Sequence, residues 1–357
     1  MIQNIFDKRG MALLITLTII TLLIVTTTEL NRRARVTIYS TATIRDRLIL
    51  SQMLVSGVNA AQAILVEDNK KSEIDSVQED WADPEKISEV LQSLAFEEGE
   101  LTVRISDERS RIQVNALVTF PEGRSFNKLQ LILWERFLSL ASLYYDDMEE
   151  MDSVNTIINS IKDWIDSGDD DATTGLTGAE SDYYEEMDPP YTARNAPFTY
   201  LPEMLQVKGI TPELFYGKDE APGISGYLTV SGMTDGAGKG FTFNGKININ
   251  TADVPVLMAL LPEVNEDLVL AIHDYRLEKS ADTYIHNLTG STWYKDVPCA
   301  GDLEIDPDLI TTRSDFFRIE ADASLGEIKM AATAVVKREK DAQTGQFRCR
   351  VLSWEQD

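Results

Sequence analysis

An uncharged, mostly apolar run near the N-terminus constrains this chain more than any other feature. The run, MALLITLTIITLLIVTTT, extends from residue 11 to residue 28, and the first charge after it is Glu29. A helix of about eighteen residues rises about 27 Å, just enough to cross the hydrocarbon core of a bilayer. Lys8, Arg9 and Gly10 precede the run, and arginines also follow it. The basic residues in front favour a cytoplasmic N-terminus, although both flanks are basic.

Three kinds of N-terminal segment compete for this run. A secretory signal peptide needs a small-residue cleavage site after the run, and TTTELNRRAR contains none. A plain signal anchor is the second alternative. The third is a prepilin-type signal, which is cut on the cytoplasmic side before the run and needs a glycine there. Gly10 supplies that glycine.

The apolar pattern continues beyond the membrane run. Between residues 36 and 66, apolar residues recur at steps of three and four, as in an amphipathic helix. They are Ile44, Leu48, Leu50, Val55, Val58, Ala61, Ile64 and Leu65. We therefore predict one helix over residues 11–66, half in lipid and half packed against a domain, with Gly57 as a point of local softening. A coiled coil is less consistent with the irregular heptads.

The remaining chain predicts an α+β fold. LTVRIS and RIQVNALV alternate apolar and polar residues around a turn and predict a β-hairpin. Helical patterns dominate residues 125–217 and recur in NTADVPVLMALL and NEDLVLAIHDYRLEK, while FFRIEADAS, IKMAATAVVKRE and FRCRVLSWE predict closing strands. Strands thus open and close the soluble part, which favours one antiparallel sheet domain interrupted by a large helical insertion.

The charge balance restricts the partners of the soluble part. The chain has 59 acidic and 33 basic residues and a net charge of -26. A polyanion of this kind repels nucleic acid and anionic lipid, and attracts cations or basic protein surfaces. Cys299 and Cys349 match no metal motif, and their spacing leaves open whether they form a disulfide after export.

An acidic segment is the strongest candidate for a metal site. Ten acids and no base lie between Asp163 and Asp188. Carboxylates that are crowded together repel one another unless a cation neutralises them, and oxygen ligands suit Ca²⁺. Glycines in the segment would let it fold round an ion, but the EF-hand spacing is not met. A solvated acidic loop is the alternative.

The motifs do not support catalysis. Neither a G-x-S-x-G elbow nor an H-E-x-x-H helix occurs, and DGAGKG precedes a strand-like segment instead of the helix that a phosphate loop needs. The segment ININTADVPVLMALLPEVNEDLVLAIHDYR resembles the helix-hairpin-helix of DNA-uptake proteins. Its hairpin, residues 261–266, lacks glycine and carries two acids, and both features oppose phosphate binding. A membrane-anchored DNA-binding protein of a DNA-uptake system is therefore the alternative function.

Several segments together resemble the K-type minor pseudopilins of the type II secretion system. They are, in order, RGMALLITL, RDRLILSQMLVSGVNAAQAIL, EIDSVQEDWA, SDERSRIQVNAL, DWIDSGDDD, DYYEEMDPPYTARNAPFTYLPEMLQVKGITPELF and KININTADVPVLMALL. The resemblance covers almost the whole chain, and the order and spacing of the segments carry it.

This resemblance implies a domain organisation. Residues 1–10 would be the leader, and residues 11–66 a transmembrane and amphipathic helix packed on an antiparallel sheet. Residues 67–122 would be the first part of the pseudopilin domain, residues 123–312 an inserted α-domain, and residues 313–357 the last strands of the sheet. Cleavage after Gly10 and methylation of Met11 are implied as well.

The resemblance also implies a function without enzymatic activity. The protein would cap the tip of a periplasmic pseudopilus and start its assembly, for export of folded proteins across the outer membrane. Its partners would be other minor pseudopilins, the major pseudopilin and the prepilin peptidase, with no nucleic acid. It would be a single-pass protein of the bacterial inner membrane with its C-terminal domain in the periplasm.

Two site assignments depend on the resemblance. K-type pseudopilins look like calcium binders, which selects Asp166, Asp169, Asp171, Glu180 and Asp182 as ligands of a structural Ca²⁺. The fifth residue of the mature chain is Ile15, where most pilin-like chains carry a glutamate. A carboxylate in lipid is costly unless it is paired, and a subunit at the tip has no neighbour ahead to supply an amine. Ile15 therefore fits a tip subunit.

Overall fold

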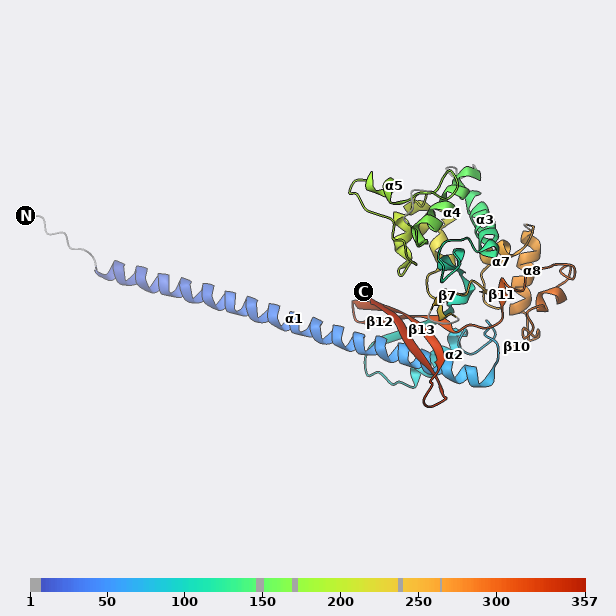
Figure 1. Ribbon diagram of the computed structural model, residues 1–357. Helices are drawn as coiled ribbons and strands as arrows, with labels where there is room; N and C mark the ends of the chain where they lie inside the picture. The colour runs from blue at the N-terminus through green and yellow to red at the C-terminus, as the bar shows by residue number, and fades with distance from the viewer. Residues whose placement is uncertain (1–7, 146–150, 169–172, 237–239, 264) are drawn as a thin grey trace, which may run out of the picture.

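The computed structural model describes residues 8–145, 151–168, 173–236, 240–263 and 265–357, and one helix dominates it (Figure 1). Helix α1 (Lys8–Lys71) contains 64 residues without interruption. The stretch from Gly10 is long and apolar enough to cross a membrane. The predicted single helix is confirmed and extends five residues beyond Val66.

Gly57 does not interrupt this helix. A Cβ atom at this position would lie 2.9 Å from Cγ2 of Val103 and 3.1 Å from Cδ2 of Leu101. The missing side chain therefore lets the helix approach the sheet closely. The close approach gives Gly57 a packing role, and the predicted local softening stays a prediction.

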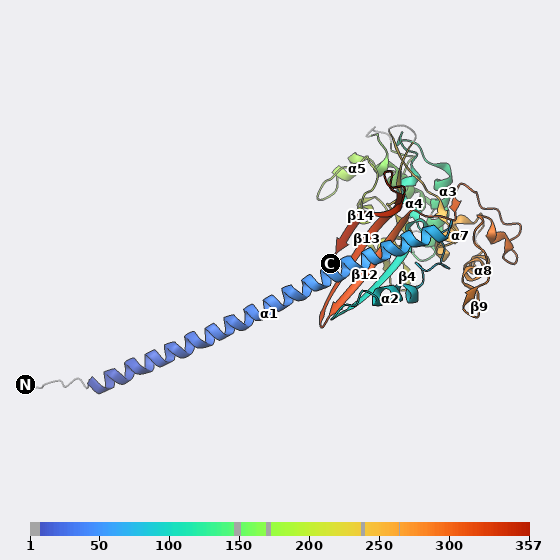
Figure 2. The ribbon, with the colours of Figure 1, turned by 90° about the horizontal axis from the view of Figure 1, so that it is seen from below.

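The second half of α1 crosses one face of a four-stranded antiparallel sheet (Figure 2). The strands are β1 (Glu100–Asp107), β12 (Phe316–Leu325), β13 (Ile328–Lys340) and β14 (Phe347–Gln356), in the order β1-β12-β13-β14. Alternate residues of β12 are buried against the helix because successive side chains of a strand point to opposite faces. The first core contains Leu50, Leu54, Ala61 and Leu65 of α1 with Phe317, Ile319, Ala321 and Ala323 of β12.

A short helix closes the side of this core. Helix α2 (Pro84–Gln92) begins with proline after Asp83, whose side chain accepts a hydrogen bond from the amide of Glu85. Both features stabilise a helix start. Trp81, just before the helix, packs edge-on against Phe317 with 5.3 Å between ring centroids.

The predicted β-hairpin of residues 101–118 is wrong. Strand β1 pairs with β12, so that Asp107 lies opposite Phe317. After β1 a 3-10 turn, η1 (Glu108–Ser110), redirects the chain, and the Asp107 carboxylate accepts a hydrogen bond from the amide of Arg109 at 2.7 Å. The following segment forms β2 (Ile112–Gln113) and η2 (Val114–Leu117), and its apolar residues are buried in the core of the helical unit.

The helical unit is built from helices and very short strands between the two parts of the sheet domain. Its longer helices are α3 (Lys128–Ser142), α4 (Met151–Ile165), α7 (Val254–Leu260) and α8 (Glu266–Leu277), and its shorter ones are α5 (Ser181–Glu185), η4 (Leu201–Gln206), α6 (Pro212–Tyr216), η5 (Ile224–Tyr227) and η6 (Trp293–Asp296). Its strands are β3 (Gly217–Lys218), β4 (Ala221–Pro222), β5 (Leu228–Thr229), β6 (Met233–Asp235), β7 (Phe241–Phe243), β8 (Ile247–Asn248), β9 (Lys279–Ser280), β10 (Thr283–Tyr284) and β11 (Ile310–Thr311).

Helix α3 packs against both α4 and α7 and is central to a second core. Trp134, Phe137 and Leu138 of α3 are buried there. The unit lies at the end of the molecule opposite the N-terminus (Figure 1). The predicted α+β fold, a long helix on an antiparallel sheet with an inserted helical unit, is therefore confirmed.

The two cysteines are free thiols that lie in different units. Cys299 is exposed and follows η6 in the helical unit. Cys349 lies on β14, with its sulfur 3.8 Å from the carbonyl oxygen of Gln62 in α1. The disulfide that the sequence left open does not form in this structure.

Candidate functional site

The uncharged run of α1, residues 11–28, presents an apolar surface on which most threonine hydroxyls are hydrogen-bonded within the helix. Its large apolar residues from Met11 to Val25 are exposed. The threonine hydroxyls among them donate to carbonyl oxygens three or four residues earlier, which satisfies them within the helix. These threonines are Thr16, Thr18, Thr21, Thr26 and Thr28. Ile15 lies on this surface, and its side chain carries no charge.

A second apolar surface on α1 lies beyond the membrane run. The first charged residue after the run, Glu29, forms ion pairs at 2.8 Å with Arg32 and with Arg33. Five large side chains further along are 57–73% exposed: Val36, Ile38, Tyr39, Ile44 and Leu48. We call these five residues the exposed strip; at 3.6 residues per turn they lie on several sides of the helix. If the helix spans a membrane from Gly10, a span of about twenty residues ends before them, so lipid would not cover them.

The free edge of the sheet is also apolar. Strand β14 is the last strand, and Val351, Leu352 and Trp354 are 36–44% exposed. Val351 lies opposite Val336 and Trp354 opposite Ala334 in the register, so both share the face that α1 crosses. The edge of the sheet and the exposed strip of α1 are thus candidate contact surfaces.

Three carboxylates of the acidic segment meet at the end of α4. Single oxygens of Asp163, Asp166 and Glu180 lie within 4.8 Å of one another, and all three residues are buried. We call them the carboxylate group. Asp163 and Asp166 are brought to the same side of the chain by their spacing of three residues at the helix end. Glu180 joins them from the residue before α5.

Asp163 organises the loop around the carboxylate group. Both of its oxygens accept hydrogen bonds from the amide of Thr174 at 3.1 Å, and Oδ2 accepts another from the amide of Ala179 at 2.9 Å. A Cβ atom on Gly178 would lie only 2.1 Å from the same oxygen, so this contact requires glycine. Burial raises the pKa of Asp163, because desolvation penalises its charged form.

Lys162 lies against the carboxylate group. Its ammonium donates to Oδ2 of Asp166 at 2.6 Å and to the hydroxyl of Thr174 at 2.8 Å. It also lies 3.8 Å from Oδ1 of Asp163. One of the three carboxylates is therefore already paired with a cation of the chain.

Two of the five predicted calcium ligands belong to the carboxylate group. Asp166 and Glu180 are brought together. Asp182 is exposed in the first turn of α5 and is not part of the carboxylate group. Asp169 and Asp171 lie outside the described residues. The prediction missed Asp163, although its spacing of three from Asp166 at the end of an amphipathic helix was a usable signal.

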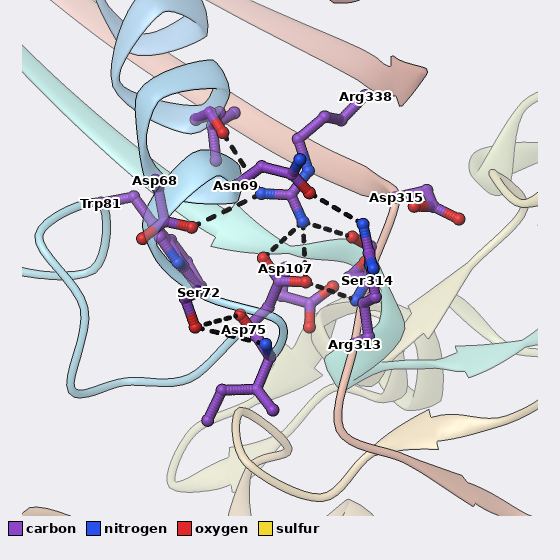
Figure 3. Close-up of polar contacts among 12 residues, drawn as sticks. Asp68, Asn69, Ser72, Asp75, Trp81, Asp107, Arg313, Ser314, Asp315 and Arg338 are labelled. Atoms are coloured by element: carbon purple, nitrogen blue, oxygen red, sulfur yellow. Dashed lines mark hydrogen bonds and ion pairs between the residues drawn. The ribbon is translucent and has the colours of Figure 1, made fainter. Parts of the chain in front are cut away.

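A buried polar network joins α1 to the sheet (Figure 3). Arg338 of β13 is 3% exposed, and its Nη2 donates to both oxygens of Asp75 at 2.6 and 2.8 Å and to the carbonyl of Ser314 at 2.8 Å. Its Nη1 donates to the carbonyl of Leu65 at 3.2 Å and lies 3.5 Å from Oδ2 of Asp68. The pKa of Asp68 is raised to about 7, mainly because burial penalises its charged form and secondly because the negative charge of Glu79 is nearby.

The same network reaches the helical unit through Asp107. Oδ2 of Asp107 accepts hydrogen bonds at 2.7 Å from the side-chain amide of Asn248 and from the hydroxyl of Thr251. The same side-chain amide also donates to the backbone carbonyl of Asp75 at 2.9 Å. Asp107 is fully buried, and desolvation raises its pKa. The network therefore links the end of α1, the sheet and the helical unit, and sequence patterns did not predict it.

The described residues around the connection between α7 and α8 are acidic and do not suit phosphate. Asn265 caps α8 by accepting a hydrogen bond from the amide of Leu268 at 3.0 Å. Glu263 in the connection and Glu266 at the start of α8 are both exposed. These acids would repel a phosphate backbone.

Comparisons with known proteins agree on one family. The family model described as type II secretion system (T2SS), protein K, matches residues 110–216. Type II secretion system protein K of Pseudomonas aeruginosa is 25% identical over 353 residues, which cover 94% of this chain and 90% of the relative. The protein K of Aeromonas hydrophila is 26% identical over 58% of this chain, and the match spans 60% of that relative's length.

A solved structure shares the fold. The GspK-GspI-GspJ complex of the type 2 secretion system from enterotoxigenic Escherichia coli contains a chain that superimposes with a TM-score of 0.62. The match covers 89% of this chain and 99% of that chain, at 17% sequence identity. With the long exposed helix, the sheet and the inserted helical unit, these matches show that the chain is similar along almost its whole length to protein K of the type II secretion system.

Proposed function

We propose that this protein caps the tip of a periplasmic pseudopilus and starts its assembly, in support of the export of folded proteins across the outer membrane. The observation that carries the proposal is the continuity of α1. A single helix presents a lipid-compatible surface, then the exposed strip, and then the side packed on the sheet. Apolar residues on the exposed strip need protein neighbours once the helix has left the membrane.

Two features support a position at the tip. The helical unit lies at the end of the molecule farthest from the N-terminus, where it would occupy the space of a further subunit above (Figure 1). Ile15 has no charge to pair with the N-terminal amine of a preceding subunit. An unpaired carboxylate in the membrane would be penalised in a subunit that has no such neighbour.

The partners that fit the exposed strip are other minor pseudopilins. The solved relative was crystallised with GspI and GspJ. We propose equivalent partners here, with the major pseudopilin below them. Cleavage by a prepilin peptidase after Gly10, methylation of Met11 and a periplasmic C-terminal domain belong to the same proposal. The family assignment favours secretion over DNA uptake, as do the acids of the α7–α8 connection.

A structural Ca²⁺ is part of the proposal, and the carboxylate group fits it. Asp163, Asp166 and Glu180 offer buried carboxylate oxygens that lie close together, which is the donor type that Ca²⁺ prefers. These three residues would hold the ion, and Asp169 and Asp171 stay predicted ligands. The ion would neutralise the acidic segment and fix its loop against α4.

Interface variants test the function. In cells that lack the native protein, Leu48→Lys should reduce co-purification with the other minor pseudopilins and reduce secretion, because it puts a charge on the exposed strip. Asn59→Lys is the matched control, since Asn59 is also exposed on α1 but lies outside the strip. Equal co-purification of both variants would argue against the exposed strip as the interface. Mass spectrometry of the mature protein would separately detect N-methylated Met11.

A further inference from the structure

Lys162 holds an unusual position for a lysine, because it is almost completely covered and lies among acids. Its side chain is 12% exposed, and the side chains of Asp163 and Asp166 are 0% and 10% exposed. The ammonium donates to Asp166 at 2.6 Å and to the Thr174 hydroxyl at 2.8 Å. A lysine on a helix can usually extend its charge into water, so this burial reflects a specific attraction.

The contacts of Lys162 involve the oxygens that a metal ion would need. Oδ2 of Asp166 is bonded to the ammonium, and Oδ1 of Asp163 lies 3.8 Å away from it. A Ca²⁺ ion takes six to eight oxygens at about 2.3–2.6 Å. An ion bound to Asp166 would therefore come close to the ammonium, and two cations in a buried site repel one another strongly.

We propose that Lys162 is a built-in counter-ion of the carboxylate group, and that a divalent cation must displace its ammonium in order to bind there. This inference rests on the calcium part of the proposed function. Without an ion, the lysine neutralises part of the acidic charge and keeps the loop from Thr174 to Glu180 folded against α4. With an ion, the lysine side chain swings away from Asp166. Lys162 thereby sets the affinity of the site.

Lys208 provides a matched comparison within the same loop. Its ammonium donates to the carbonyl oxygens of Thr177 and Gly178 at 3.1 and 3.2 Å and lies 4.7 Å from the ring centroid of Tyr183. It contacts the loop but forms no ion pair among the described residues. Removing Lys208 thus changes the net charge and the loop contacts as much as removing Lys162, without freeing a carboxylate.

The experiment is calorimetric titration of the full chain in detergent with Ca²⁺, combined with thermal unfolding in chelator and in Ca²⁺. Lys162→Met should bind Ca²⁺ about tenfold to a hundredfold more tightly than the wild type, the range expected for losing a charged hydrogen bond. In chelator its Tm should fall by about 5 °C, and Ca²⁺ should restore it. Lys208→Met and Lys162→Arg should keep the affinity of the wild type.

The outcomes separate this inference from the calcium proposal. Equal affinities of the wild type and Lys162→Met would overturn the inference and leave the calcium proposal intact. Binding by Lys162→Met alone would support the inference and end the calcium proposal for the native chain. Binding by neither would overturn both. If Lys162→Met is unfolded in chelator, folding on addition of Ca²⁺ supports the inference, and failure to fold in Ca²⁺ overturns it.

Discussion

Replacing Arg338 by methionine should cause a large loss of stability. The guanidinium is the cation between two buried acids, with two bonds to Asp75 and one longer contact to Asp68. Methionine fills similar space but leaves both carboxylates buried without a partner of opposite charge. Removal of one partner from a buried ion pair typically costs about 3–5 kcal/mol. We expect a loss in that range, because the carbonyls of Leu65 and Ser314 lose a donor as well.

The loss should also depend on pH. The pKa of Asp68 is raised to about 7 in the folded protein, from an ordinary value of 3.8. A carboxyl group whose pKa is higher in the folded than in the unfolded protein stabilises the fold when it is protonated. This contribution is complete below the pKa of the unfolded state and is lost as the pH rises through the pKa of the folded state. Protonation therefore relieves the unpaired charge in Arg338→Met at low pH. The deficit relative to the wild type should be smaller at pH 5 than at pH 8.

Urea unfolding of the purified full-length protein in detergent, followed by tryptophan fluorescence at both pH values, measures this deficit. Arg104→Met is the control, because Arg104 is 81% exposed and lies 3.6 Å from Glu320 across the outer face of the sheet. A surface pair of this kind contributes at most about 1 kcal/mol. A deficit for Arg338→Met as small as that of Arg104→Met, or one that grows as the pH falls, would refute the reasoning.

Three further predictions concern other parts of the molecule. Gly178→Ala should lose about 1–3 kcal/mol in thermal unfolding, because its Cβ would collide with Asp163, whereas Gly226→Ala, with open space around it, should be close to neutral. Asp68→Asn should flatten the decline of wild-type stability between about pH 4 and pH 7, and a wild-type profile without that decline would contradict the raised pKa. Ile15→Glu should lower secretion, measured as exported protein in the medium, since its carboxylate would have no amine to pair with at the tip. Full secretion by this variant would contradict a position at the tip.

The parts of the fold that follow from local periodicity could be predicted from the sequence. Helix α1 and strands β12, β13 and β14 each repeat one pattern over many residues, and the structure contains them. The hairpin prediction failed because the alternation in residues 111–118 resembles that of a strand. The decisive contact was the turn at Asp107, whose carboxylate caps η1 and faces residues far along the chain.

The candidate site shows the same limit. The acidic composition indicated the segment, and Asp166 and Glu180 were found. Asp163 could be paired with Asp166 from their spacing of three, but its contacts with the loop amides of Thr174 and Ala179 could not be predicted from the sequence. Lys162 carries no signal in a sequence, since most helical lysines extend into solvent.

The junction between the two units explains why long-range polar contacts decide this fold. An apolar interface would let the helical unit settle in several nearby orientations, because apolar contacts have little directionality. Here the Asp107 carboxylate accepts hydrogen bonds from Asn248 and Thr251. Asn248 also donates to the backbone carbonyl of Asp75, and the Asp75 carboxylate pairs with Arg338. Hydrogen bonds weaken steeply when their angles change, so this chain of contacts admits one orientation. Because Asp75 lies four residues beyond the end of α1, the contacts that stabilise the sheet also fix the helical unit relative to the membrane helix.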